Sequence, residues 1–115
     1  ASQHPLTRAV LGRIVLDEAA HGSFGWAFLD WAEDKLSDAD RVHLAKTAHR
    51  AIAGIHAIWA DLRKRPQGAD SEVHALGWMQ TAPYLELARR SMETRVVAPL
   101  RARGIEVSGA EPQTA

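Results

Sequence analysis

The feature that most constrains the fold is a stretch of about thirty residues without an internal proline, from Pro5 to Leu36. A proline suits the first turn of a helix, where its missing N–H would have no partner anyway. As one helix, a stretch of this length would be roughly 48 Å long, while the mean helix has only about 11–12 residues. The segment therefore predicts an all-α protein built from long antiparallel helices.

Two further helices follow from the pattern of apolar residues and breakers. Ser37 with an acid three residues later, Asp40, is a helix-start signal. It opens a predicted helix over residues 38–62, and Pro83 suits the start of another over residues 82–102. The apolar stripes of these helices recur every three to four residues: Leu44, Ala48, Ile52, Ile55, Trp59 and Leu62 in one, and Leu85, Ala88, Met92 and Val96 in the other.

The segments between and after these helices carry turn and loop signals. Residues 63–70 are charged and contain Pro66 and Gly68, so they predict an exposed loop. Pro99 is expected to kink or end the last helix, because a proline inside a helix costs about 3 kcal/mol. The tail over residues 108–115 is small and polar, and it is expected to fray.

Composition limits the classes of protein to consider. The 115 residues suit a single domain over residues 1–115. Their net charge of zero gives no electrostatic reason to expect nucleic acid or a membrane surface as partner. Cysteine is absent, which excludes disulfides and thiolate ligands and fits a cytoplasmic protein. No apolar run approaches the roughly 18 residues needed to span a bilayer.

The chemistry of the chain concentrates in the first helix. At about 100° per residue, Glu18 and His21 lie one turn apart, on the face that also carries Val10, Ile14 and Phe28. A carboxylate on a buried apolar face must be paired, protonated or bound to metal. Residues at i and i+3 can place a carboxylate oxygen and an imidazole nitrogen on one ion, as in carboxylate-bridged bundles. Glu18 and His21 are therefore candidate metal ligands.

The surrounding residues resemble a known superfamily. The stretch "DEAAHGSFGWAFLDWA", with Gly25, Trp26 and Trp31 after the Glu-x-x-His motif, resembles the Asp-Glu-x-x-His helix of bacterial ferritin-like domain proteins. The resemblance covers about 25 residues. It implies a di-iron or manganese site in a four-helix bundle, to which two Glu-x-x-His helices and two further Glu-bearing helices contribute. Asp17 is then expected to accept the second ring N–H of a liganding histidine on a facing helix, which would fix the tautomer of that ring.

The chain departs from this pattern, because it contains a single Glu-x-x-His and no Glu in residues 38–62. Glu86 and Glu93 lie about 100° or more from the centre of their apolar stripe, and they are ligands only if that flank faces the site. Two explanations are open for the other ligands. They belong to a missing N-terminal half of a longer protein, or a second copy contributes its own Glu-x-x-His helix. The absence of an initiator Met favours the N-terminal half.

The expected function is that of a metal-binding ferritin-like domain, either a complete bundle or a half-bundle. The resemblance implies an oxygen-dependent oxidase or oxygenase that uses iron or manganese, and it identifies no catalytic residue beyond the ligands. Two alternatives stay open. One is iron storage by a ferroxidase assembly, and the other is a metal-free helical module in which Glu18 pairs with a basic residue. The sequence names no substrate.

Overall fold

A computed structural model describes residues 2–65, 75–77 and 79–112 of the chain. Helices make up most of these residues, and no strand occurs among them. The prediction of an all-α fold is therefore confirmed. In chain order the elements are α1 (Pro5–Ala32), the 3₁₀ turn η1 (Glu33–Lys35), α2 (Asp38–Lys64), α4 (Thr81–Met92), the π-helical turn η2 (Glu93–Val97) and α5 (Ala98–Ala102).

The predicted start signals are present at both long helices. Pro5 opens α1, and Nδ1 of His4 accepts a hydrogen bond from the Thr7 N–H at 3.4 Å. Ser37 and Asp40 form a reciprocal capping box, in which each side chain accepts the other residue's backbone N–H, at 3.1 and 2.9 Å. These bonds satisfy donors that the first helical turn leaves free. Helix α1 gives way to a 3₁₀ turn at Glu33, a few residues before the predicted end.

The predicted helix over residues 82–102 is present as a continuous helical segment, Thr81 to Ala102, with a change of winding inside it. The π turn η2 immediately precedes α5, whose first turn contains Pro99. Proline cannot donate to the preceding turn and clashes with it, and a single π turn is a usual way to absorb such a break. Pro99 therefore rewinds the helix without ending it.

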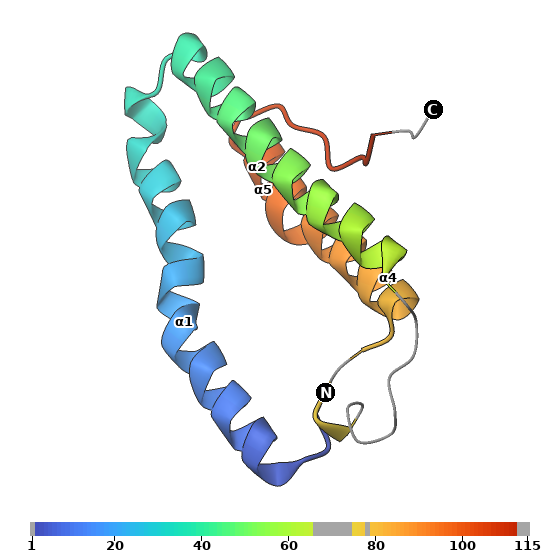
Figure 1. Ribbon diagram of the computed structural model, residues 1–115. Helices are drawn as coiled ribbons and strands as arrows, with labels where there is room; N and C mark the ends of the chain where they lie inside the picture. The colour runs from blue at the N-terminus through green and yellow to red at the C-terminus, as the bar shows by residue number, and fades with distance from the viewer. Residues whose placement is uncertain (1, 66–74, 78, 113–115) are drawn as a thin grey trace.

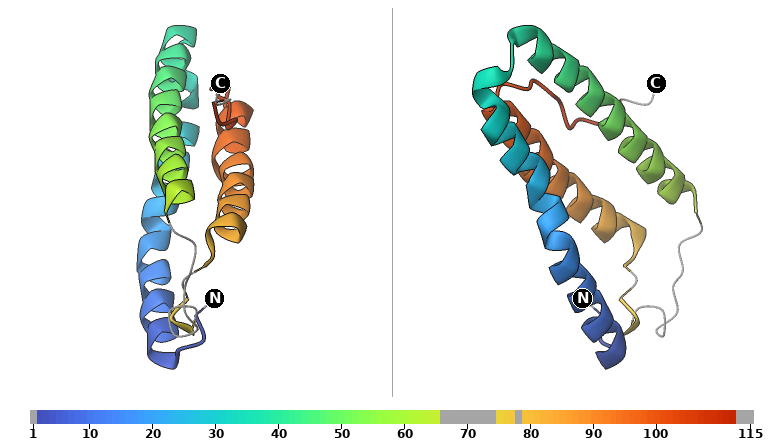
Figure 2. Two further views of the ribbon diagram at one scale, coloured as in Figure 1. Left: turned by 45° about the vertical axis from the view of Figure 1, so that its right-hand side comes forward. Right: turned by 90° about the vertical axis from the view of Figure 1, so that its left-hand side faces the viewer.

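The core lies between α2 and the segment formed by α4, η2 and α5, which run side by side in the views of Figures 1 and 2. Most residues of the two predicted stripes face each other there, but Ile55 is 37% exposed and lies outside the core. The segment that follows α5 closes the same core after a turn at Gly104, whose φ of 77° suits glycine. The buried apolar side chains of this core are Ile52, Trp59, Leu85, Met92, Val97, Ile105 and Val107.

Two loop predictions meet different outcomes. Helix α2 runs on to Lys64, so the predicted loop over 63–70 begins later, and residues 66–70 lie outside the described residues.

The tail does not fray over residues 108–112. The Gly109 carbonyl accepts a hydrogen bond from Nε2 of the buried His56 at 3.2 Å. The carboxylate of Glu111 binds both Arg63 of α2 and Arg89 of α4, the latter at 2.6 Å. Residues 113–115 are outside the described residues.

The tail contacts make a pH-dependent contribution to stability. Burial raises the pKa of the Glu111 carboxyl, but the hydrogen bonds and charges of Arg63 and Arg89 outweigh it, so the pKa lies below its ordinary value. A carboxylate with a lowered pKa stabilises the fold above its unfolded-state pKa and loses that effect as the pH falls through the folded-state value. We expect Glu111→Gln to lower the free energy of unfolding by about 1 kcal/mol at neutral pH.

Urea unfolding in a series of buffers from neutral to acidic pH checks this expectation. The difference between wild type and Glu111→Gln should shrink as the pH falls below the ordinary pKa of a glutamate and vanish below the folded-state pKa. Glu106→Gln, at an exposed position of the same segment, is the control and should change little at any pH. A pH-independent loss in Glu111→Gln would show that the ion pairs do not carry the effect.

Helix α1 stands apart from this core, as Figure 1 shows for the blue arm of the molecule. Of its 28 residues only Ala32 is buried. Its last turns are tied down, because Arg103 binds both carboxylate oxygens of Asp30 at 2.7 and 3.2 Å and lies 5.0 Å from the Trp26 ring centroid. The Arg103 hydrogen bond lowers the pKa of Asp30.

The outline of the molecule reflects this separation. The radius of gyration is 17.4 Å, whereas a compact domain of about 100 residues has roughly 13 Å. None of the described helices combines the length and the apolarity needed to cross a bilayer. Helix α1 is rich in apolar residues, a composition typical of a buried helix, yet most of its side chains are exposed in the single chain.

Candidate metal site

The structure brings the two predicted ligands together. Nδ1 of His21 lies 3.0 Å from Oε2 of Glu18, and both side chains project from the middle of α1. Helical spacing of three residues produces this contact without any help from the rest of the chain. The Glu-x-x-His motif is therefore a preformed local unit, with one carboxylate oxygen and one imidazole nitrogen aimed at the same space.

In the single chain the two atoms are hydrogen-bonded to each other, and because a carboxylate only accepts, the proton belongs to Nδ1 of His21. A shared metal ion would have to displace that proton. Two donor atoms that each lie about 2.1 Å from an ion, at roughly a right angle, are about 3 Å apart. Carboxylate and imidazole together suit iron and manganese. If a metal ion took the place of the Nδ1 proton, Nε2 of His21, which points away from Glu18, would carry the ring's proton and could donate it to a second residue.

The pair is not buried, which corrects the prediction that it faces the inside of a bundle. The Glu18 and His21 side chains are 64% and 79% exposed. Their apolar neighbours on the same face, Val10, Ile14 and Phe28, are exposed as well. The helical spacing does place these residues on one face of α1, but in a single chain no described element covers that face.

Asp17 has a local partner in place of the expected histidine. Its carboxylate lies 3.1 Å from Nε of Arg13, one turn earlier on α1. The Glu-x-x-His motif does not include Arg13, so the sequence analysis missed this ion pair. The separation of four residues between Arg13 and Asp17, which is typical of helical ion pairs, could have predicted it. Both side chains are exposed, so this ion pair is weak and leaves Asp17 free to exchange partners.

Glu86 and Glu93 lie on α4 and at the start of η2, and both face arginines there. Glu86 lies 3.6 Å from Arg90 and Glu93 lies 3.3 Å from Arg101. The two carboxylates belong to exposed ion pairs of the α4–α5 segment. The structure does not bring either of them to Glu18 and His21.

His56 has a structural place. It is buried beside Trp59, with ring centroids 5.2 Å apart, and it holds the tail through Gly109.

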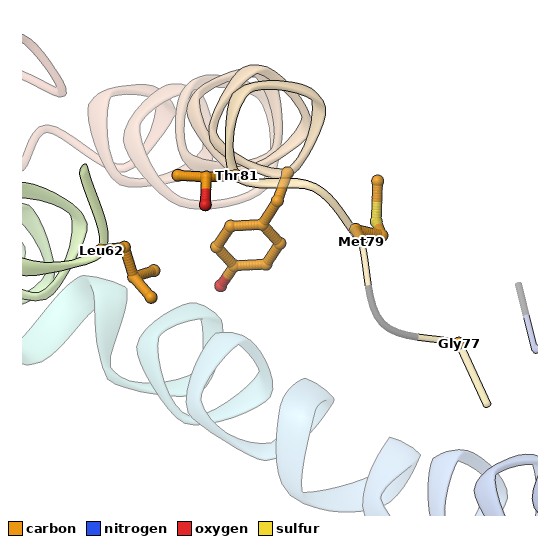
Figure 3. A pocket seen from close by; sticks show the side chains of 5 residues that line it. Leu62, Gly77, Met79 and Thr81 are labelled. Carbon is orange, nitrogen blue, oxygen red and sulfur yellow. The ribbon is translucent and has the colours of Figure 1, made fainter. Parts of the chain in front are cut away.

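A pocket of about 390 Å³ lies at the end of α2, and it is lined by Leu62, Gly77, Met79, Thr81 and Tyr84. Figure 3 shows Leu62 of α2 facing this pocket opposite the start of α4. The described residues of its lining include two hydroxyl groups, those of Thr81 and Tyr84.

Within residues 2–65, 75–77 and 79–112, no three histidine, aspartate or glutamate side chains lie close enough together to hold one metal ion. Of the predicted metal-site residues, the described chain brings together only Glu18 and His21, with Asp17 beside them on the same helix. Comparison with protein-family models, with characterised proteins and with solved structures finds no match for this chain.

Proposed function

We propose that this chain is a metal-binding ferritin-like domain in which Glu18 and His21 supply half of a site for iron or manganese. The observation that carries the proposal is the 3.0 Å approach of the Glu18 carboxylate to the His21 imidazole on an apolar, uncovered helix face. The other ligands come from outside the single chain, either from an N-terminal segment or from a second copy.

The chemistry that fits such a site is oxygen-dependent oxidation of an organic substrate, which the resemblance to ferritin-like proteins implies. Bound iron or manganese would supply the redox step. The part of this chain is to hold the ion through one oxygen and one nitrogen donor. A covering element would then exclude water from a face that is otherwise apolar, which strengthens every charge interaction at the site.

Metal loading tests the proposal directly. Chelator-treated protein is mixed with Fe(II) or Mn(II) without oxygen, desalted and assayed for bound metal by elemental analysis. We expect wild type to retain metal. His21→Ala and Glu18→Gln should each weaken binding by at least about 100-fold, because loss of even an outer-shell partner of a metal site costs about 10–100-fold.

Two variants serve as matched controls. Glu86 is exposed to the same 64% as Glu18, and Glu86→Gln should leave metal binding unchanged. His43→Ala removes an exposed histidine of α2 and should do the same. Failure of wild type to bind either ion at micromolar concentrations would show that copies of this chain do not complete a metal site, which leaves a site completed by an N-terminal segment or a metal-free interaction module. Loss of metal in Glu86→Gln would make Glu86 a ligand.

A further inference from the structure

The uncovered face of α1 has a seven-residue repeat. Apolar or site residues recur at alternating steps of three and four along the whole helix, which is the spacing of a coiled-coil seam. The seam consists of Thr7, Val10, Ile14, Asp17, His21, Phe24, Phe28 and Trp31. All of these except the half-buried Thr7 are exposed. Asp30, which Arg103 holds, lies about 120° around the helix from Glu18, so the docked end of α1 leaves the seam open.

Two copies of the seam are complementary in shape when they pair antiparallel, but not when they pair parallel. Its first half is small or aliphatic and its second half is aromatic, with Asp17 and His21 between them. If two copies lie antiparallel and centred on Ala19, then Val10 faces the partner's Phe28 and Ile14 faces the partner's Phe24. Small side chains then meet large ones along the seam, which is how packed layers interdigitate.

Charge favours the same direction. The antiparallel register places Asp17 level with the partner's His21, twice about the twofold axis, whereas a parallel register stacks Asp17 on Asp17.

The glycines and the uncovered area agree with a helix partner. A Cβ at Gly22 or Gly25 would meet nothing within 4 Å, so packing inside one chain does not require glycine there. Each glycine costs a helix roughly 1 kcal/mol relative to alanine. Gly25, one turn after His21, borders the seam, whereas Gly22 points away from it. The three aromatic side chains of the seam, largely uncovered, supply roughly half of the about 800 Å² per partner that stable interfaces bury.

We propose that a second copy of this chain covers α1, antiparallel and centred near Ala19, so that the two Glu18–His21 pairs meet across the twofold axis. Asp17 then lies opposite the partner's His21 and can accept the Nε2 proton of that ring. The helix pairing rests on α1 alone, whereas the statement that the pairing completes a metal site rests on the proposed function. The partner copy is thus part of the site.

Cysteine cross-linking of otherwise cysteine-free protein tests the register. Arg13, Ala20 and Ala27 occupy the same heptad position and are all exposed. In the proposed register Ala20 is offset by about 3 Å along the axis from its counterpart, Arg13 by about 18 Å and Ala27 by about 24 Å. A bis-maleimide that spans the interhelical distance of about 8–10 Å is added to each single-cysteine variant. We expect Ala20→Cys to link into dimers, and Arg13→Cys and Ala27→Cys to stay single.

Linking of all three variants would establish a parallel or disordered association and overturn the register. Linking of none, with light scattering that gives the mass of one chain at high micromolar concentration, would overturn the dimer and leave an N-terminal segment as the cover. Both measurements are made on metal-free protein as well as loaded protein. A dimer that links at Ala20→Cys and takes up no Fe(II) or Mn(II) would uphold the pairing and reject the proposed function.

Discussion

Replacing Phe24 by glutamate is expected to convert the protein from a dimer to a monomer while the helical fold remains. Phe24 lies in the seam and is 71% exposed in the single chain, so its loss removes little that holds one copy together. Burial of a phenylalanine contributes about 1.5–3 kcal/mol, and each dimer contains the residue twice. The dissociation constant should therefore rise by at least about 100-fold. Light scattering over a dilution series measures it.

Leu16→Glu is the matched control for this variant. Leu16 is 73% exposed, carries the same change of apolar to acidic, and points away from the seam. It should leave the dissociation constant within a few-fold of wild type. Circular dichroism of both variants should show unchanged helix content. Equal dissociation in the two variants would mean that general apolarity of α1, and not the seam, holds the copies together.

Much of the fold could be predicted from the sequence, because local signals and tertiary packing agree in α2 and α4. Ser37 and Asp40 form the predicted capping box, and Ile52 and Leu85 lie in the core that their stripes indicated. Strict apolar spacing in two amphipathic helices leaves few other ways to bury both. The tail was predicted less well. His56 and Glu111 hold it through contacts between distant parts of the chain, which no local pattern reveals.

The candidate site could be predicted only in its local part. The contact of Glu18 with His21 follows from a spacing of three on a helix, so the motif was enough to place it. The prediction that Glu18 and His21 are buried was wrong, and the reason lies outside the motif. Apolar periodicity shows which residues share a helix face. Whether that face is buried depends on other elements, and no described element covers this face of α1. For the same reason, the sequence could not show which way Glu86 and Glu93 face. In the structure both carboxylates pair with arginines of their own segment.

The core between α2 and α4 is expected to respond to truncation far more strongly than the exposed face of α2. Trp59 is 4% exposed and packs in the core, with the His56 ring beside it. Truncating a buried tryptophan to alanine removes a large apolar area and leaves a cavity that neighbours fill only in part, at a cost of about 3–5 kcal/mol. His56 would also lose the ring that positions it against Gly109, and with it the anchor of the tail.

Ile58→Ala provides the comparison, because Ile58 is the neighbouring residue of the same helix and is 60% exposed. Its truncation should change the free energy of unfolding by about 0.5 kcal/mol or less. Urea unfolding followed by circular dichroism, at one protein concentration for all variants, measures both. A loss of about 3–5 kcal/mol is a large share of the about 5–15 kcal/mol by which a domain of ordinary stability resists unfolding. Similar losses in the two variants would show that α2 does not pack through its Trp59 face. The core would then have to be sought on the side that Ile58 occupies.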